Sequence, residues 1–177
     1  MELIYVTIQI IYNHAENAKW SIKMNKEYNK QLVEKYPFLL PRNRWTGKVS
    51  KDYDYSFTEL DDMPDGWRKA FGEQMCEEIK QELEEKGCLD EYRISQIKEK
   101  YGVLCWYDFG CTEKMWTEII PKYQKLSKRT CIKCGKPATK VTLGWISPYC
   151  DECCPDFEYT TSVEEYEKGL QHKIIVY

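Results

Sequence analysis

The sequence predicts an α+β fold, in which helices pack on a β-hairpin or small antiparallel sheet and a cysteine-containing module follows near the C-terminus. Three observations predict it: a long helical pattern of apolar residues between positions 61 and 87, two strand-like segments joined by a glycine turn at 92–109, and five of the nine cysteines within 131–154. The chain has 177 residues, of which 42% are hydrophobic, so it is long enough for one domain with a small appendage.

The first segment, residues 1–23, is interpreted as an N-terminal strand or extension. Apolar side chains alternate over Leu3–Ile11, which is typical of a strand with one buried face. No basic region precedes this stretch and no small-residue cleavage site follows it, so we expect no signal peptide. No apolar run reaches the ~20 residues that span a bilayer, so we expect no membrane association. The cysteines are then expected in a reducing compartment, where paired cysteines bind metal more often than they form disulfides.

An α+β core is expected over residues 24–129. Its first helix opens at Asn25 and ends before Pro37, because the residue that precedes a proline is disfavoured in the helical conformation. The apolar positions of this helix share one face, and they are Tyr28, Leu32, Val33 and Tyr36. The next stretch, 39–64, is polar and rich in turn residues, so we expect a loop there.

The most regular helix of the sequence follows this loop. Asp61 or Asp62 can cap it, Pro64 falls in its first turn, and Gly87 supplies the stop. Its apolar residues recur at helical spacing, and they are Trp67, Phe71, Met75, Ile79 and Leu83. We expect this stripe to be buried against the hairpin that comes next in the chain.

The hairpin is expected as two strands, Tyr92–Glu99 and Val103–Phe109, joined by a turn at Lys100–Gly102. A further helix should follow, capped by Thr112 and kinked or split by Pro121. Its apolar positions are Met115, Trp116, Ile119, Ile120, Tyr123 and Leu126. The tail, residues 156–177, is interpreted as a short helix followed by a strand at Lys173–Val176.

Residues 130–155 form the module that the cysteines define. Two C-x-x-C pairs are separated by fifteen residues, a spacing that is typical of a zinc-ribbon-like site with four cysteine ligands. The expected ligands are Cys131, Cys134, Cys150 and Cys153. Cys154 adjoins the last of them and is an alternative fourth ligand, but the two-residue spacing favours Cys153. Stretches 139–143 and 145–149 supply the two strands of a hairpin between the pairs.

We expect one Zn²⁺ per chain, since zinc is the usual ion for four sulfurs, although iron can occupy such sites after bacterial expression. Four thiolates fill the tetrahedral shell and leave no position for water or substrate, so the ion is expected to be structural. The only histidines, His14 and His172, belong to no hydrolase signature, and no glycine-rich phosphate loop is present. The sequence therefore predicts a protein that is not an enzyme.

The net charge of −3 conceals a segregation of charge along the chain. Residues 52–91 carry fourteen acids against four bases, whereas 113–140 carry eight bases against two acids. The acids of the central helix either pair with the basic helix at 113–129 or face a partner, and they are Glu73, Glu77, Glu78, Glu82, Glu84 and Glu85. A loop at 41–48 mixes cations with an aromatic ring, a pattern that can grip phosphates and stack on a base, and its candidate residues are Arg42, Arg44 and Trp45.

Four blocks of the sequence carry a resemblance to a known family. They are YPFLLPRNRWTGK, DYDYSFTELDDMPDGWRKAFGEQMCEEI, YRISQIKEKYG with WYDFG, and RTCIKCGKPATKVTLGWISPYCDEC. In this combination, over about residues 24–153, the chain resembles a family of small uncharacterised phage and prophage proteins that bind zinc. Residues 1–23 and the tail beyond Cys154 lie outside the resemblance.

The resemblance implies a phage origin, and with it a location in the cytoplasm of a bacterial host cell. Small zinc-containing proteins of this kind include type II-A anti-CRISPR proteins, and the chain is similar to them in size, acidity and lack of a catalytic signature. We therefore expect a Cas9 inhibitor that binds a Cas9-type effector directly and blocks its access to nucleic acid. The alternative is a nucleic-acid-binding phage accessory protein that uses the basic stretch and the 41–48 loop. The acidic balance favours the inhibitor, and we expect no binding to DNA itself.

Overall fold

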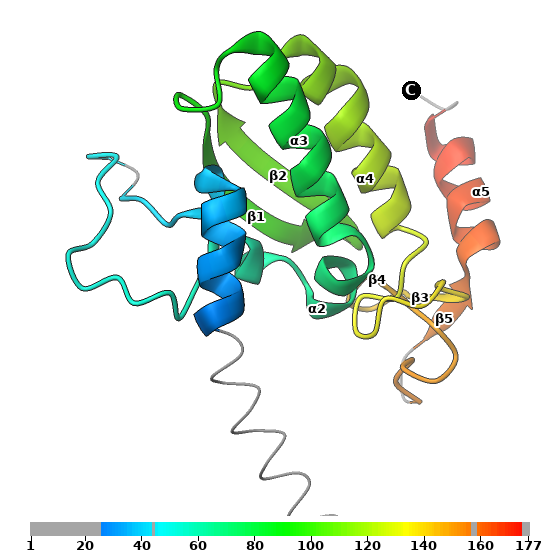
Figure 1. Cartoon of the computed structure of the whole chain (residues 1–177). Coiled ribbons are helices and arrows are strands. Elements are labelled where there is room, and N and C mark those ends of the chain that lie inside the picture. Colours follow the sequence, from blue (N-terminus) through cyan, green and yellow to red (C-terminus); the bar gives the residue numbers. More distant parts are fainter. Residues whose placement is uncertain (1–25, 44, 157–158, 175–177) are drawn as a thin grey trace, which may run out of the picture. The chain divides into compact units, whose positions relative to one another are not determined.

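The computed structural model describes residues 26–43, 45–156 and 159–174, with side chains up to residue 169 (Figure 1). The expected α+β architecture is confirmed: helices accompany two small antiparallel sheets, and the four paired cysteines gather in the C-terminal part of the chain. The chain divides into two compact units, which meet in sequence between Thr58 and Glu59. This division falls inside the 24–129 range that the sequence treats as one core.

In the first unit, residues 26–35 are helical, a single 3-10 turn follows at Pro37–Leu39 (η1), and the chain is then irregular up to Thr58. Leu32 and Tyr36 are buried as expected, but Tyr28 is 43% exposed and the neighbouring Asn29 is buried instead. The Asn29 amide donates a 3.1 Å hydrogen bond to the carbonyl oxygen of Tyr55, and this partner allows a polar side chain to be buried. The strand expected at Leu3–Ile11 lies outside the described residues.

The central helical run of the second unit combines three segments that follow one another without a break. They are α2 (Asp65–Trp67), the π-helical segment η3 (Arg68–Gly72) and α3 (Glu73–Lys86). Gly87 ends the run in the left-handed conformation, with φ of 67°, and its N–H bonds to the carbonyl oxygen of Glu84. The five residues of the expected apolar stripe are each at most 2% exposed, which confirms that the stripe is buried.

The expected cap of this helix is wrong. Asp61 and Asp62 belong to a separate 3-10 turn, η2 (Glu59–Asp62), and the N-cap position is held by Pro64, which makes no side-chain capping bond. The Asp61 carboxylate instead forms an ion pair with Arg68, one turn into the helix. The 3-10 turn therefore carries both aspartates away from the helix start, and the charge of Asp61 serves a side-chain contact.

A second helical run consists of the π-helical segment η4 (Met115–Ile119) and α4 (Ile120–Ser127). The Thr112 cap is confirmed, because its Oγ1 accepts a 3.2 Å hydrogen bond from the N–H of Met115. Pro121 lies in the first turn of α4, where the helix changes from the π-helical to the α-helical hydrogen-bonding pattern. This change falls where the proline was expected to kink or split the helix. The apolar positions of this run are not all buried: Trp116 is 69% exposed and Leu126 is 40% exposed.

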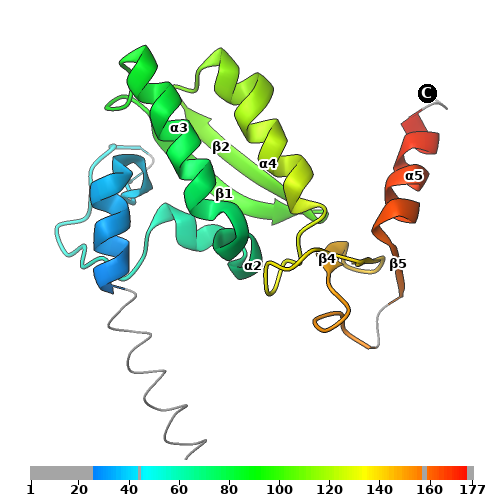
Figure 2. The same ribbon diagram turned by 45° about the vertical axis from the view of Figure 1, so that its right-hand side comes forward.

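The hairpin joins β1 (Arg93–Lys100) to β2 (Val103–Phe109) as expected. Its two-residue turn places Tyr101 and Gly102 at φ of 53° and 73°, the pair of positive values that a type I′ turn requires. Figures 1 and 2 show α3 and α4 lying side by side across one face of this hairpin. That face contributes buried side chains to the core, and they are Ile97, Leu104 and Trp106.

The C-terminal sheet has three short strands in the order β4-β3-β5, with β3 at Lys140–Thr142, β4 at Ser147–Tyr149 and β5 at Thr160–Ser162. The first two are the hairpin strands expected between the cysteine pairs. In the tail, β5 precedes the helix α5 (Val163–Ile174). The strand expected at Lys173–Val176 is wrong at Lys173 and Ile174, which are helical, and its last two residues lie outside the described residues. The tail thus adds the third strand of the sheet that carries the cysteines.

The start of α5 explains this order. The N–H of Glu165 bonds to Ser162 Oγ at 3.2 Å, and the N–H of Ser162 bonds to Glu165 Oε2 at 3.4 Å. These reciprocal bonds form a capping box, which fixes the helix start directly after β5.

In the described ranges, no helix is long and apolar enough to cross a membrane.

We expect Phe71→Ala to lower the free energy of unfolding by about 3–5 kcal/mol, because a fully buried ring leaves a cavity when it is removed. The Phe71 ring is 2% exposed and its centroid lies 5.5 Å from that of Tyr123 on α4. Urea denaturation followed by circular dichroism measures the loss. Trp116→Ala is the control, with an expected change within about 0.5 kcal/mol because this ring is exposed. Similar small losses in both variants would contradict the core assignment.

Candidate metal centre

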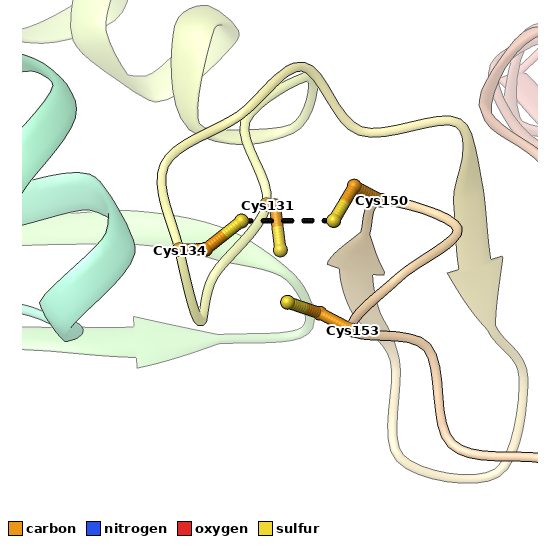
Figure 3. A group of neighbouring side chains, drawn as sticks. All are labelled: Cys131, Cys134, Cys150 and Cys153. Carbon is orange, nitrogen blue, oxygen red and sulfur yellow. Dashed lines mark hydrogen bonds between the residues drawn. The ribbon is translucent and has the colours of Figure 1, made fainter. Parts of the chain in front are cut away.

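The first cysteine pair lies on a tight turn that begins directly after the isolated bridge between Thr130 and Pro137. The N–H of Gly135 bonds to the carbonyl oxygen of Cys131 at 3.0 Å, and the N–H of Cys131 bonds back to the carbonyl oxygen of Lys136 at 2.8 Å. Gly135 has φ of 83°, a left-handed conformation that glycine adopts without strain. The turn therefore directs the side chains of Cys131 and Cys134 to the same side (Figure 3).

The second pair lies on a similar turn directly after β4. The N–H groups of Cys153 and Cys154 both bond to the carbonyl oxygen of Cys150, at 3.2 and 3.0 Å. The two turns are held together by a bond from the N–H of Ile132 to the carbonyl oxygen of Pro148 at 2.9 Å. The β3–β4 hairpin thus brings two turns that are distant in sequence to one point.

At that point the sulfur atoms of Cys131, Cys134, Cys150 and Cys153 all lie within 4.8 Å of one another. Figure 3 shows the four side chains converging, with Cys134 Sγ and Cys150 Sγ 3.6 Å apart. Four sulfurs bound to one zinc ion at about 2.3 Å stand about 3.8 Å from each other, so the cluster has the dimensions of a tetrahedral Zn–S site. The structure therefore brings together four cysteines that can hold one metal ion, and their number and spacing are compatible with zinc.

The electrostatics of the cluster favour a cation. Although burial acts in the opposite direction, hydrogen bonds from the backbone at Cys150, Cys134 and Lys133 lower the pKa of the Cys131 thiol to about 7. Burial and the neighbouring sulfur of Cys134 raise the pKa of Cys153 to about 12. Several thiolates this close repel one another, and a divalent cation at their centre removes the repulsion while releasing the protons.

The alternative ligand, Cys154, lies outside the cluster. Its sulfur faces the carbonyl oxygen of Pro155 at 3.9 Å, and it does not belong to the group of four converging sulfurs. The geometry favours Cys153 as the fourth ligand, as the two-residue spacing predicts.

The first cysteine turn is also the docking point for the start of α2. The N–H of Gly66 bonds to the carbonyl oxygen of Ile132 at 2.9 Å, and the indole Nε1 of Trp67 donates to the carbonyl oxygen of Thr130 at 2.9 Å. A Cβ atom on Gly66 would lie 2.2 Å from the carbonyl oxygen of Cys131, so only glycine fits there. Sequence reasoning missed this contact, because neither glycine nor tryptophan at a helix start indicates a partner elsewhere in the chain.

Two of the six candidate partner-binding glutamates contact the second helical run or the residues at its start instead of a partner. Glu82 has a side chain that is 1% exposed, accepts a 2.8 Å hydrogen bond from Thr112 Oγ1, and places Oε2 3.1 Å from Lys114 Nζ. The hydrogen bond from Thr112 and the charge of Lys114 lower the pKa of Glu82, so the carboxylate stays ionised although it is enclosed. Its assignment to a partner surface is wrong.

Glu78 makes the second of these contacts. Its Oε1 lies 2.6 Å from Lys122 Nζ and accepts a 2.8 Å hydrogen bond from the Tyr123 hydroxyl. Burial acts to raise the pKa of Glu78, but the bonds from Lys122 and Tyr123 outweigh it and lower that pKa. Two acids of α3 therefore pair with the basic helix of the same chain, which is the first of the two outcomes that the sequence left open.

The remaining candidate acids lie on the outer side of α3. Glu73, Glu84 and Glu85 are exposed, and Glu77 is half-buried and accepts a hydrogen bond from Gln81. Glu84 has an i,i+4 contact of 3.6 Å with Lys80. Such exposed pairs hold the side chain weakly, so the acids are accessible for contact.

The 41–48 loop belongs to the first unit, whereas the six glutamates belong to the second. Asn43 Oδ1 accepts hydrogen bonds from the N–H groups of Trp45 and Thr46, and the turn leaves the Trp45 ring 95% exposed. Arg42 donates to the carbonyl oxygen of Gly47 at 3.2 Å, so its guanidinium helps to close the loop. Arg44 lies outside the described residues.

Comparison of the chain with protein-family models, with curated proteins and with solved structures finds no match.

We expect about one zinc ion per purified chain, measured by inductively coupled plasma mass spectrometry. Cys134→Ser removes one of the four converging sulfurs, and it should abolish stoichiometric zinc and unfold at least residues 130–155. Cys154→Ser is the matched control, because this sulfur lies outside the cluster, and it should retain the metal. Equal loss of zinc in both variants would show that the fourth ligand is wrongly chosen. A folded wild-type chain without metal would contradict the site itself.

We expect Gly66→Ala to destabilise the chain by on the order of 2–3 kcal/mol, because the new methyl group meets backbone atoms of the cysteine turn that have no room to move. It should also speed the transfer of zinc to a chelator, since the same turn holds two of the cysteines. Thermal unfolding and a chelator competition with a coloured zinc indicator measure the two effects. Gly72→Ala is the control: its Cβ would meet side chains no closer than 3.4 Å, so stability should hold or rise. Zinc transfer at the wild-type rate in Gly66→Ala would contradict the coupling.

Proposed function

We propose that the chain is a phage-encoded, non-catalytic anti-CRISPR protein that binds a Cas9-type effector directly, in the cytoplasm of the bacterial host, and blocks its access to nucleic acid. A structural zinc ion would hold the C-terminal module in shape. A closed shell of four thiolates supports a structural role for the ion, because it leaves no coordination site for a substrate. The resemblance to phage and prophage proteins is what points to the host and to the target.

The observation that carries the proposal is the internal pairing of the basic stretch 113–140. Five of its eight basic residues form ion pairs with acids of the same chain. The pairs are Lys114 with Glu82, Lys122 with Glu78, Arg129 with Glu167, Lys136 with Glu152, and Lys140 with Asp151. The sequence suggests this stretch as the source of phosphate contacts in a nucleic-acid-binding accessory protein. The five pairs place an acid beside each of these bases, which lowers the net positive charge that the stretch offers to a phosphate.

Three acids of α3 remain exposed on the second unit. Glu73, Glu84 and Glu85 present negative charge along a rigid helix, as a nucleic-acid backbone does. A Cas9-type effector holds its heteroduplex in a positively charged channel, so an acidic helix is complementary to it. Complementary charge speeds the encounter and makes it sensitive to salt.

The test begins with a pull-down of the tagged chain from a host that carries CRISPR–Cas systems. Association with the purified effector–guide complex is then measured by biolayer interferometry, together with cleavage of target DNA. Substituting Glu73→Lys, Glu84→Lys and Glu85→Lys together should slow association by about tenfold and weaken inhibition of cleavage. Zinc content should not change, since these residues lie outside the metal site.

The matched control applies the same change of charge to exposed acids of the first unit. Glu27→Lys, Glu34→Lys and Asp52→Lys together should leave association and inhibition unchanged. Equal losses in both triple variants would show that only the net charge matters. Full inhibition by the first triple variant would place the docking surface elsewhere, and no effector in the pull-down would refute the proposal.

A further inference from the structure

The face of the β1–β2 hairpin that points away from α3 and α4 has a composition of its own. Burial alternates along β2, where Leu104 and Trp106 are buried and the residues between them are more exposed. The pairing register then gives the residues of this outer hairpin face, which are Arg93, Gln96, Lys98, Lys100, Val103, Cys105, Tyr107 and Phe109. In antiparallel strands, directly paired residues lie on the same face of the sheet.

All charges on the outer hairpin face are positive. Arg93, Lys98 and Lys100 supply them, and among the described residues no carboxylate lies within ion-pair distance of these three. The acids of the same strands lie on the opposite face and are already bonded. Glu99 accepts a hydrogen bond from the N–H of Gly102, and Asp108 accepts one from the Tyr92 hydroxyl. This surface is therefore cationic although the chain is acidic overall.

The same face carries exposed aromatic rings. Tyr107 is 44% exposed and Phe109 is 62% exposed, and two residues along a strand separate them by about 7 Å. Lys98 Nζ lies 5.0 Å from the centre of the Tyr107 ring, so cation and ring form one contact surface. Exposed rings in such a position are unfavourable in water and gain from stacking on a flat ligand.

The aromatic series continues past the hairpin turn. Tyr101 is 69% exposed, with Lys100 Nζ 5.6 Å from its ring centre. The turn borders a pocket of about 350 Å³ that is lined by Glu99, Lys100 and Tyr101 of the hairpin and by Gly144, Trp145 and Ile146 of the β3–β4 connection. Trp145 is 75% exposed. Aromatic rings and lysines are thus distributed from the end of β2 to the β3–β4 connection.

We propose that the outer hairpin face binds single-stranded nucleic acid. Unpaired bases offer the flat rings that stack on Tyr107 and Phe109, and the phosphates between them pair with the three cations. A duplex keeps its bases stacked on one another and cannot use the rings, so it should bind less tightly. The expectation of no nucleic-acid binding came from the charge of the whole chain, whereas the alternation of the strands places their acids on the opposite face.

The surface is separate from the exposed acids of α3, which lie on the helix layer at the other side of the hairpin (Figure 2). The inference therefore does not depend on the proposed function, and the purified zinc-loaded chain is sufficient to test it. Fluorescence anisotropy with fluorescein-labelled U15 and dT15 measures binding, and a 15-base-pair duplex provides the comparison. A preference between U15 and dT15 identifies RNA or DNA as the favoured strand.

We expect dissociation constants in the micromolar range at about 50 mM salt. Three phosphate contacts predict that affinity falls about 20-fold between 50 and 200 mM salt. Lys98→Gln with Lys100→Gln should reduce this fall to about threefold. The control, Lys69→Gln with Lys125→Gln, removes two exposed cations of the helices and should leave the salt dependence unchanged.

Stacking is tested by Tyr107→Ala with Phe109→Ala, which should weaken binding at least tenfold. Trp116→Ala removes an exposed ring from η4 and should have no effect. Circular dichroism and zinc content verify that each variant is folded. The proposal is overturned if neither oligonucleotide binds at 100 times the expected micromolar concentration, or if the double aromatic variant binds as the wild type does. Displacement by poly-glutamate at the same concentration as by U15 would also overturn it, because charge alone would then account for binding.

Discussion

The second unit depends on a contact between backbone groups, in which the start of α2 docks on the turn that carries Cys131 and Cys134. One hydrogen bond joins Gly66 to Ile132, and the Trp67 indole reaches the carbonyl oxygen of Thr130. Trp67 is the first member of the buried stripe, so one side chain belongs to the hydrophobic core and also bonds to the residue that precedes the cysteine turn. Structural zinc sites contribute about 10–16 kcal/mol to the folding of small modules, and here that free energy would also secure the helix.

Part of the segregated charge of the chain is used within the chain, in ion pairs between the acidic and the basic helix. Glu78 and Glu82 fix α3 against the basic helix, and Tyr123 both donates a hydrogen bond to Glu78 and contacts the Phe71 ring. A carboxylate as enclosed as that of Glu82 needs its hydroxyl and ammonium partners to remain ionised. The charge that stays exposed on this unit is segregated by face rather than by stretch of sequence.

The sequence predicts the features that depend on short-range patterns. The hairpin, the Trp67–Leu83 stripe, the Thr112 cap and the convergence of two C-x-x-C pairs each follow from spacing within one segment. Two features that it does not predict depend on partners outside the local pattern. Asn29 is buried because it bonds to Tyr55, and Asp61 lies in a 3-10 turn and forms an ion pair with Arg68 instead of capping the helix. The order of the tail is an exception, because Ser162 and Glu165 form a capping box that can be read from the sequence.

The π-helical segments η3 and η4 have a consequence for the rotational phase of the two helices. A strict four-residue repeat turns by about 40° per step around an α-helix, so the line from Trp67 to Leu83 would wind roughly 160° around the axis. A π-helical turn, with i→i+5 bonds, rotates less per residue and so reduces this winding. The segment η3 includes Phe71, the second residue of the stripe. Met115, Ile119 and Tyr123 repeat the same four-residue interval through η4. Each helical run thus contains one wide turn that reduces the winding of its apolar line, and Phe71 and Tyr123, whose ring centroids lie 5.5 Å apart, belong to these two lines.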